Sequence, residues 1–180
     1  MSIETDYATL RRVIHEFQPE GWAAEFGVYS GYSLDIIAAH MPVIGFDSFE
    51  GLPEDWREGF PKGTFADGWA KHHLDNPSHL YPGRQMLVPG WFEDTVPTFP
   101  FPALSLVHID CDLYSSTVTA LEAITPHMRT GTLLVFDEYH SYPGAEEHEE
   151  AAFEEWRSHY NIRVQELARG SEEAAFVIED

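Results

Sequence analysis

Residues 22–31 read WAAEFGVYSG, and this stretch decides the fold that we expect for the chain. Its first part is a short apolar run of the kind that forms a buried strand. A turn over 29–31 ends in glycine, and Leu34, Ile37 and Ala38 then recur at helical spacing. The stretch therefore predicts a strand that passes through a tight turn into a helix.

The same alternation continues along the chain. Helical spacing recurs over 116–128 and 144–160. Apolar runs of strand length recur at residues 42–47, 104–110, 132–137, 162–167 and 174–178. Strands that read as continuous apolar runs between helices indicate a parallel sheet covered on both faces. We therefore expect a doubly wound, mostly parallel α/β sheet, closed by an antiparallel hairpin because no helix separates the last two runs.

The composition points to one folded domain over residues 1–180. That length suits a single domain, since domains commonly run about 100–200 residues. Lys and Arg number 10 against 31 Asp and Glu, so the formal net charge is −21. A surface this acidic repels nucleic-acid phosphates and anionic lipids. We therefore expect neither a nucleic-acid nor a membrane partner.

The cysteine count and the absence of long apolar runs bear on location. Cys111 is the only cysteine, which excludes an internal disulfide and a multi-cysteine zinc site. The first residues contain no apolar stretch of the signal-peptide type. No run approaches the roughly 20 apolar residues of a membrane-spanning helix. We expect a cytoplasmic protein, and a homodimer is compatible with the sequence.

Residues 48–85 break the alternation of strands and helices. Long loops without secondary structure are uncommon in compact domains and are usually functional. This segment is rich in proline and glycine, yet it also contains Phe49, Trp56, Phe60, Phe65, Trp69 and Tyr81. So much aromatic surface predicts a folded cap over one end of the sheet, inserted after the second strand. An insertion that merely packs on the body would explain the segment equally well.

Acidic residues follow the expected strands where ligands bind in such folds. In an open parallel sheet, that place is the carboxyl edge. Neighbouring strands lie about 4.8 Å apart, so Asp110 and Asp137 would face one another with Glu138 beside them. Carboxylates that converge repel unless a cation or protons neutralise them, and such oxygen ligands suit Mg²⁺. The alternative is that Asp112 and Glu138 point into solvent and that Asp137 caps a helix.

The glycines after the first strand indicate a second kind of site. The pattern E-x-G-x-x-x-G over 25–31 lets the backbone turn tightly and approach a ligand closely. It lacks the third glycine of the dinucleotide pattern G-x-G-x-x-G. Asp47, after the second strand, is placed to accept hydrogen bonds from two ribose hydroxyls. A tight turn without a ligand would explain the glycines alone, but the combination favours an adenosine ligand without a pyrophosphate.

Five blocks of sequence carry a resemblance to a known family. They are EFGVYSGYSLDIIA (25–38), GFDSFEGLPEDW (45–56), GWFEDTVP (90–97), LSLVHIDCDLYSSTVTALE (104–122) and GTLLVFDEYH (131–140). Together, and in this order, they resemble the macrocin O-methyltransferase-like family, from about Trp22 to beyond Phe153. The resemblance implies a seven-stranded class I fold, with S-adenosylmethionine and Mg²⁺ as cofactors. It also implies methylation of a hydroxyl on a small acceptor, a sugar of a natural product; a catechol-type acceptor is the alternative.

The resemblance also implies roles for individual residues. The methionine end of the cofactor would be lined by Glu25, Gly27, Tyr29, Gly31 and Ser33. Ribose would be held by Asp47 and Ser48, and adenine by Gly90, Trp91 and Phe92. Asp110 would contribute both to the cofactor site and to a metal site completed by Asp137 and Glu138. Asp112 matches the general base, and we add His140 as a candidate for substrate contact or a second base.

This chain differs from the described family members in two places. Family members described as antibiotic sugar methyltransferases have a longer N-terminal region that closes over the substrate, where this chain has only the residues before Trp22. The last metal position is Glu138, where the best-described members commonly have Asp.

The chemistry is consistent with these residues. Methyl transfer from a sulfonium is an in-line displacement that depends on positioning. An alcohol becomes a good nucleophile when it loses its proton, which a metal and a carboxylate promote.

Three other functions fit these residues less well. A nicotinamide-dependent oxidoreductase would need the third glycine and a hydride-site pair. A magnesium-dependent phosphohydrolase would need Lys or Arg near the motifs to hold phosphate. A non-catalytic protein with the same fold, acting through protein contacts, would not need the acidic constellation.

Two further patterns are interpreted as structural features without a role in catalysis. His108 lies within an expected strand and is interpreted as a hydrogen-bonded core histidine. The glutamates at 146, 147, 149, 150, 154 and 155 are interpreted as a solvated helix face.

Overall fold

A mixed sheet forms the centre of the molecule. The computed structural model describes residues 7–66 and 83–180, and within these ranges the sheet has seven strands in the order β3-β2-β1-β4-β5-β7-β6. The strands are β1 (Trp22–Phe26), β2 (Val43–Asp47), β3 (Gln85–Pro89), β4 (Leu104–Ile109), β5 (Leu133–Phe136), β6 (Val164–Arg169) and β7 (Ala174–Ile178). The pairs among β1 to β5 are parallel, whereas β7 pairs antiparallel with both β5 and β6.

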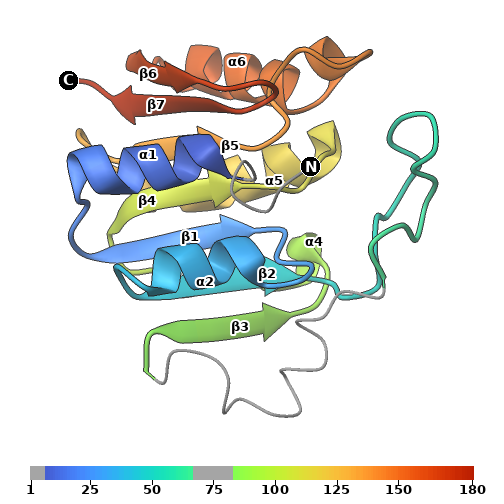
Figure 1. The fold of residues 1–180 in the computed structure, drawn as a ribbon, viewed down its shortest axis with the longest axis horizontal. Helices are drawn as coiled ribbons and strands as arrows, with labels where there is room; N and C mark the ends of the chain where they lie inside the picture. The colour runs from blue at the N-terminus through green and yellow to red at the C-terminus, as the bar shows by residue number, and fades with distance from the viewer. Residues whose placement is uncertain (1–6, 67–82) are drawn as a thin grey trace.

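Helices cover both faces of this sheet. The α-helices are α1 (Ala8–Phe17), α2 (Tyr32–Ala38), α4 (Phe92–Thr95), α5 (Tyr114–Ile124) and α6 (Glu149–His159), with 3₁₀ turns η2 (Thr125–His127) and η3 (Ala145–Glu147). In Figure 1, α1 and α2 lie in front of the sheet, while α5 and α6 lie behind it. The doubly wound α/β fold and the closing hairpin predicted from the sequence are thus confirmed.

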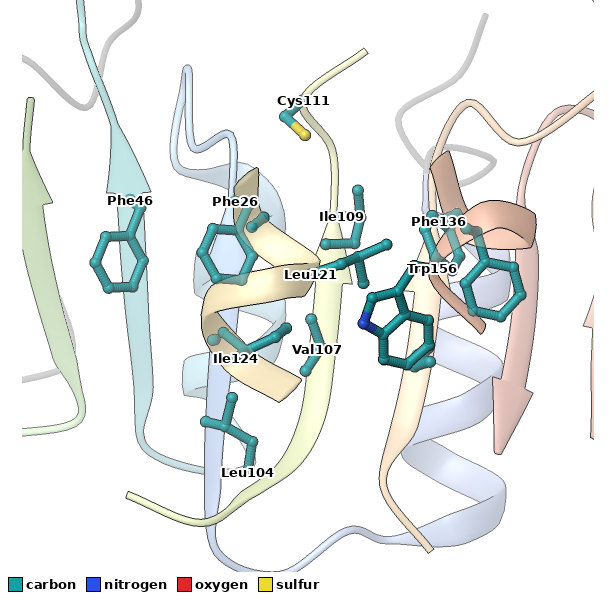
Figure 2. Packing of buried hydrophobic residues seen from close by; sticks show 14 of the residues in the cluster. Phe26, Phe46, Leu104, Val107, Ile109, Cys111, Leu121, Ile124, Phe136 and Trp156 are labelled. Carbon is teal, nitrogen blue, oxygen red and sulfur yellow. The ribbon is translucent and has the colours of Figure 1, made fainter. Parts of the chain in front are cut away.

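The face under α5 and α6 holds the larger aromatic core. Figure 2 shows Phe26 and Phe46 on adjacent strands, with Leu121 of α5 and Trp156 of α6 packed over the sheet. The rings of Phe26 and Phe46 stack with their centroids 5.2 Å apart. Burial of apolar surface is the main force that docks these helices. The opposite face is aliphatic, with helices α1 and α2 packed on Leu106, Leu133 and Val135.

The structure differs from the sequence expectations at several boundaries. The helix expected over 116–128 begins earlier, at Tyr114, and ends in the turn η2. The region expected as one helix over 144–160 is split into η3 and α6, because the backbone at His148 (φ −116°, ψ −116°) is not helical. The structure also contains a strand at 85–89 and a helix at 8–17, neither of which is among the elements expected from the sequence.

Residues 48–66 pack against later parts of the chain in a small separate core at the carboxyl edge. Leu52 and Trp56 pack with Leu113, Tyr142 and Ala145, and Phe60 and Phe65 lie against them. The ring of Trp56 contacts Phe60 and Tyr142 edge to face at 5.2 and 5.6 Å. The rest of the expected cap, with Trp69 and Tyr81, lies mostly outside the described residues, so the cap as a whole stays a prediction. In Figure 1 the described part projects beyond the strand ends.

None of the helices in the described ranges combines the length and the apolar character needed to cross a bilayer.

Candidate active site

A cavity of about 610 Å³ lies at the carboxyl edge of the sheet. Its wall includes residues that follow β1, β2, β4 and β5, together with part of the 48–66 segment. Of the residues predicted from the sequence, the lining contains Gly27, Tyr29, Asp47, Ser48, Trp91, Phe92, Asp110, Asp112, Asp137 and Glu138. Glu25, Gly31, Ser33, Gly90 and His140 are not part of it. Ligands of open parallel sheets bind at this edge, so the cavity is the natural candidate site.

Gly27 is required where the loop after β1 passes the loop after β4. Its backbone has φ +90°, and a Cβ placed there would lie 1.7 Å from the carbonyl oxygen of Asp110. No side chain can be accommodated at that distance, so only glycine permits this approach. The contact brings the glycine turn and the acidic end of β4 into one cavity.

Asp47 holds the glycine turn in place. Its Oδ2 accepts hydrogen bonds from the backbone N–H groups of Val28 and Tyr29, both at 2.8 Å. Its Oδ1 accepts one from the N–H of Phe49 at 2.7 Å. A carboxylate has about four acceptor positions, so these three bonds leave little capacity for the two ribose hydroxyls expected from the sequence. In this structure the evident role of Asp47 is to fix the loop.

Glu25 lies in β1 and is completely buried behind the cavity wall. Its Oε1 is 2.9 Å from Nδ1 of His108, which is also completely buried. Burial raises the pKa of the Glu25 carboxyl, and the hydrogen bond to His108 opposes that shift. The interpretation of His108 as a hydrogen-bonded core histidine is therefore confirmed.

Tyr7 brings the start of α1 to the cavity. It lines the wall, and its ring meets that of His108 edge to face at 5.8 Å. The nearby Asp110 carboxylate, followed by burial, raises the pKa of the Tyr7 hydroxyl. Tyr7 is therefore a neutral hydrogen-bonding group at this wall. Tyr7 is not among the site residues predicted from the sequence.

Trp91 and Phe92 form the wall beyond the second strand. Trp91 is the N-cap residue of α4, and the Thr95 hydroxyl donates a 2.9 Å hydrogen bond to its carbonyl oxygen. Phe92 meets Phe26 edge to face at 5.7 Å. Gly90 lies just before them, and its N–H donates to the Asp47 carbonyl oxygen at 2.9 Å. The glycine thus ties this wall to the end of β2.

Asp110, Asp137 and Glu138 converge at the ends of the neighbouring strands β4 and β5. One carboxylate oxygen from each lies within 4.8 Å of the others. Burial raises the pKa of all three, and it brings that of Asp137 to about 6. The Asp137 charge raises the pKa of Asp110 further. Three partly buried oxygen ligands at this spacing fit a hard divalent cation such as Mg²⁺.

Asp112 lies in the turn between β4 and α5 and is 6% exposed. Its backbone is left-handed, with φ 66°. Burial and the Asp137 charge raise the pKa of its carboxyl to about 7, while Arg57 opposes the shift. The burial of Asp112 contradicts the alternative in which this side chain points into solvent. A carboxyl with a pKa near neutrality is suited to accept a proton.

Glu149 corrects one expectation from the sequence. The run of glutamates predicts a solvated helix face, but Glu149 is completely buried at the first turn of α6. Burial, then the charges of Asp112 and Asp137, raise its pKa. The signal was available, because Glu149 precedes the buried Ala152, Phe153 and Trp156 at helical spacing. The other glutamates of that run are exposed or only partly buried.

His140 lies beside the cluster but outside the cavity lining. It is partly buried, and its Nδ1 contacts the hydroxyl of the adjacent Ser141. Its role as a second base or substrate contact stays a prediction.

The chain matches known methyltransferases over most of its length. The model of the family described as Macrocin-O-methyltransferase (TylF) matches residues 34–169. The 8-demethyl-8-(2,3-dimethoxy-alpha-L-rhamnosyl)-tetracenomycin-C 4'-O-methyltransferase of Streptomyces olivaceus is 30% identical in an alignment that covers 66% of this chain and 53% of that relative. The demethyldecarbamoylnovobiocin O-methyltransferase of Streptomyces niveus is 27% identical over 64% of this chain and 47% of its own length. The chain thus spans about half the length of these curated relatives.

Solved structures show the same architecture. The O-methyltransferase NovP superposes with a TM-score of 0.78 at 21% identity, over 96% of this chain and 78% of that one. The calicheamicin methyltransferase CalS11 superposes with a TM-score of 0.71 at 26% identity, over 94% of this chain and 76% of that one. The fold expected from the sequence is therefore shared with these methyltransferases.

Proposed function

The chain belongs to the macrocin-O-methyltransferase family, and on that premise we propose that it is an O-methyltransferase. It transfers a methyl group from S-adenosylmethionine to a hydroxyl of a small acceptor, a sugar of a natural product. One observation carries the proposal: a single cavity joins the glycine turn after β1 to the acidic cluster after β4 and β5. A methyl donor and a hydroxyl acceptor need such adjacent sites, because the transfer is an in-line displacement.

The cofactor end of the cavity is assigned to the residues around the glycine turn. Gly27 and Tyr29 would contact the methionine part, with Glu25, Gly31 and Ser33 supporting that loop from within. Asp47 and Ser48 lie where ribose is expected, and Trp91 and Phe92, preceded by Gly90, form an apolar wall suited to adenine. When bound, S-adenosylmethionine supplies an electrophilic methyl group on a sulfonium. The residues of this chain contribute a fixed backbone, an apolar wall and exclusion of water.

The metal end is assigned to Asp110, Asp137 and Glu138. Their convergent oxygens and raised pKa values fit a divalent cation, and Mg²⁺ is proposed for its preference for carboxylate ligands. A bound divalent cation lowers the pKa of an oxygen next to it. The longer side chain of Glu138 reaches the same point as the two aspartates, so it remains in the proposed ligand set.

Asp112 is the proposed general base. It lines the cavity near the acidic cluster, and its raised pKa favours uptake of a proton. In the proposed reaction Asp112 accepts the proton of the acceptor hydroxyl while the oxygen forms its bond to the methyl carbon. The cofactor leaves as S-adenosylhomocysteine. Solvent then takes this proton from Asp112, which returns the carboxylate to its starting state.

The names of the relatives support the proposed acceptor class. The two curated relatives have names that refer to a rhamnosyl tetracenomycin and to demethyldecarbamoylnovobiocin. A glycosylated natural product is therefore the proposed acceptor. A cytoplasmic location and a homodimer stay predictions.

A methyl-transfer assay tests the proposal. The purified chain is incubated with S-adenosylmethionine, Mg²⁺ and a panel of glycosides and catechols, and products are measured by mass spectrometry. The proposal expects a mass gain of one methylene on a glycoside, absent with Asp112→Asn. A methylated catechol without any methylated glycoside would move the acceptor to the catechol class.

A further inference from the structure

Asp112 lies in an unusual turn. The N–H of Leu113 donates to the carbonyl oxygen of Cys111 at 2.7 Å, which closes a three-residue turn around Asp112. With φ 66° at its centre, this is the rare and strained form of such a turn. A non-glycine residue in a left-handed conformation persists only where its surroundings hold it there. The residue that holds it determines where the Asp112 carboxyl lies.

The C-terminal side of the turn is held by α5. Leu113 is the N-cap residue of that helix, and its carbonyl oxygen accepts the Thr117 N–H and the Thr117 hydroxyl, both at 2.9 Å. These bonds fix Leu113, but they do not reach the amides of Cys111 and Asp112. Those two N–H groups need another acceptor, because a buried amide without one is costly.

Glu149 supplies that acceptor from a different part of the chain. Its Oε1 accepts the N–H groups of Cys111 at 3.4 Å and of Asp112 at 3.3 Å. Both distances are long, as expected when one oxygen is shared by two neighbouring amides. Its Oε2 has no hydrogen-bond partner among the described residues. Because Glu149 is completely buried, it is held in one place by the packing of α6.

The burial of this carboxylate is otherwise unfavourable. Charged groups are rarely buried without a partner, and four other carboxylates lie in the same region. Glu149 is the first residue of α6, where the helix dipole favours a negative charge and offsets part of the cost of burying the carboxylate. The two contacts to the turn give a glutamate a structural role at this position on the apolar stripe of α6.

We propose that Glu149 is a positioning residue, which fixes the strained turn and thereby aims the Asp112 carboxyl into the cavity. This inference rests on the proposed function for the role of Asp112, but the clamp itself is a property of the fold. It links α6 to the turn between β4 and α5. The clamp acts through the position of one acceptor oxygen. The length of the side chain at position 149 therefore matters more for holding the turn than its negative charge does.

Two conservative variants distinguish the effect of side-chain length at position 149 from the effect of its charge. Glu149→Gln keeps the length and offers an amide oxygen to both N–H groups. Glu149→Asp keeps the charge, but withdraws the acceptor by one methylene. Glu150→Asp is the matched control, since Glu150 is the next residue of the same helix turn and is only partly buried.

Amide hydrogen exchange at Cys111 and Asp112, followed by NMR without any ligand, is the primary measurement. The clamp predicts exchange about tenfold faster in Glu149→Asp, as expected for the loss of one such bond, and little change in Glu149→Gln or Glu150→Asp. Amides of the central strand β4 should keep their protection in all variants. Equal acceleration in Glu149→Gln and Glu149→Asp, or none in Glu149→Asp, overturns the inference. If acceleration in Glu149→Asp extends to β4, the role is general packing, and the inference also fails.

A second measurement connects the clamp to turnover. With a glycoside found by the methyl-transfer assay, Glu149→Asp should lower kcat about tenfold at unchanged KM for S-adenosylmethionine, and Glu149→Gln should restore most of it. An unchanged kcat in Glu149→Asp contradicts a positioning role. If wild-type protein binds no S-adenosylhomocysteine and methylates nothing, the proposed function fails, while the exchange data still decide whether the clamp exists.

Discussion

The two ends of the cavity are held by different forces. At the cofactor end, Asp47 is satisfied by three backbone N–H groups at 2.7 to 2.8 Å. At the acidic end, the carboxylates of Asp110, Asp137 and Glu138 converge, and burial raises the pKa of each. The first end is complete within the polypeptide, whereas the second is balanced only when protons or a cation neutralise it.

This difference has a functional consequence. A preformed backbone cradle binds a ligand without much ordering cost. A cluster of carboxylates stores repulsion that a divalent ion relieves. We therefore expect the cofactor end to work without metal, and the acidic end to depend on it. Variants at either end test whether the two ends work independently.

The largest effect is expected for Asp112→Asn, which removes the proposed base and leaves the cofactor end intact. Turnover should fall by about 10³-fold, in the range typical of general-base removal. Binding of S-adenosylhomocysteine should stay close to that of the wild type, as should the melting temperature at pH 5, where the Asp112 carboxyl is already neutral in the folded protein. Turnover within a factor of two of the wild type would exclude Asp112 as the base.

Gly27→Ala should damage both ends at once, because Gly27 touches the Asp110 carbonyl. The added Cβ forces the loops after β1 and β4 apart, at a cost on the order of 4 kcal/mol in unfolding free energy. Gly59→Ala is the control, since Gly59 has the same φ of +90° but nothing within 4 Å of the added carbon. It should cost about 1–2 kcal/mol from backbone strain alone. Equal losses in urea unfolding of the two variants would disprove the close approach at Gly27.

The stability of the metal-free protein should depend on pH through the acidic end. Burial raises the pKa of Asp137 to about 6 and that of Asp112 to about 7, so the folded state binds more protons than the unfolded state between about pH 4 and 7. Stability therefore falls as pH rises through that window, by several kcal/mol, and stays low above it.

Two changes should reduce this loss of stability at high pH. Mg²⁺ should restore the stability of the protein at pH 8, and Asp137→Asn should make the stability of the metal-free protein depend less on pH. Urea unfolding at pH 5 and pH 8, with and without Mg²⁺, measures both. A stability that rises from pH 5 to pH 8 in the absence of metal is the opposite of what the acidic cluster requires.

The smallest effect is expected for Asp47→Asn. Asparagine keeps one acceptor oxygen, but its NH₂ group cannot accept the N–H groups that Asp47 now holds. The glycine turn should loosen, and affinity for S-adenosylhomocysteine should fall about tenfold. Mg²⁺ binding, measured by calorimetry, should be unchanged. A loss of Mg²⁺ binding of the same size would mean that the two ends are not separate.

Much of the fold was predictable because its central strands are almost uniformly apolar. β4 is buried at every position, and such runs bounded by turns are strong strand signals. β3 was missed because it lies at the sheet edge and is only partly buried. Helix α1 was missed although Leu10, Val13 and Ile14 carry the helical period that packs it on the sheet.

The candidate site was predictable to the level of strand ends. Asp110, Asp137 and Glu138 were expected to meet because adjacent strand ends must do so, and the structure brings them together. The place of Tyr7 in the cavity wall depends on how α1 docks, so no local pattern predicts it. The helical spacing of Glu149 with Ala152 and Phe153 predicts its burial, but its contact with the turn at Asp112 depends on how α6 docks. The left-handed turn at Asp112 was equally invisible, because nothing in the residue types of that loop demands it.

Calorimetric titration with S-adenosylhomocysteine, first on metal-stripped protein and then with Mg²⁺ restored, tests the central claim most directly. The separation of the two ends predicts one site per chain, with a Kd on the order of micromolar in both conditions. No binding in either condition, from protein shown to be folded, would contradict the methyltransferase function. Binding only in the presence of Mg²⁺ would contradict the independence of the cofactor end.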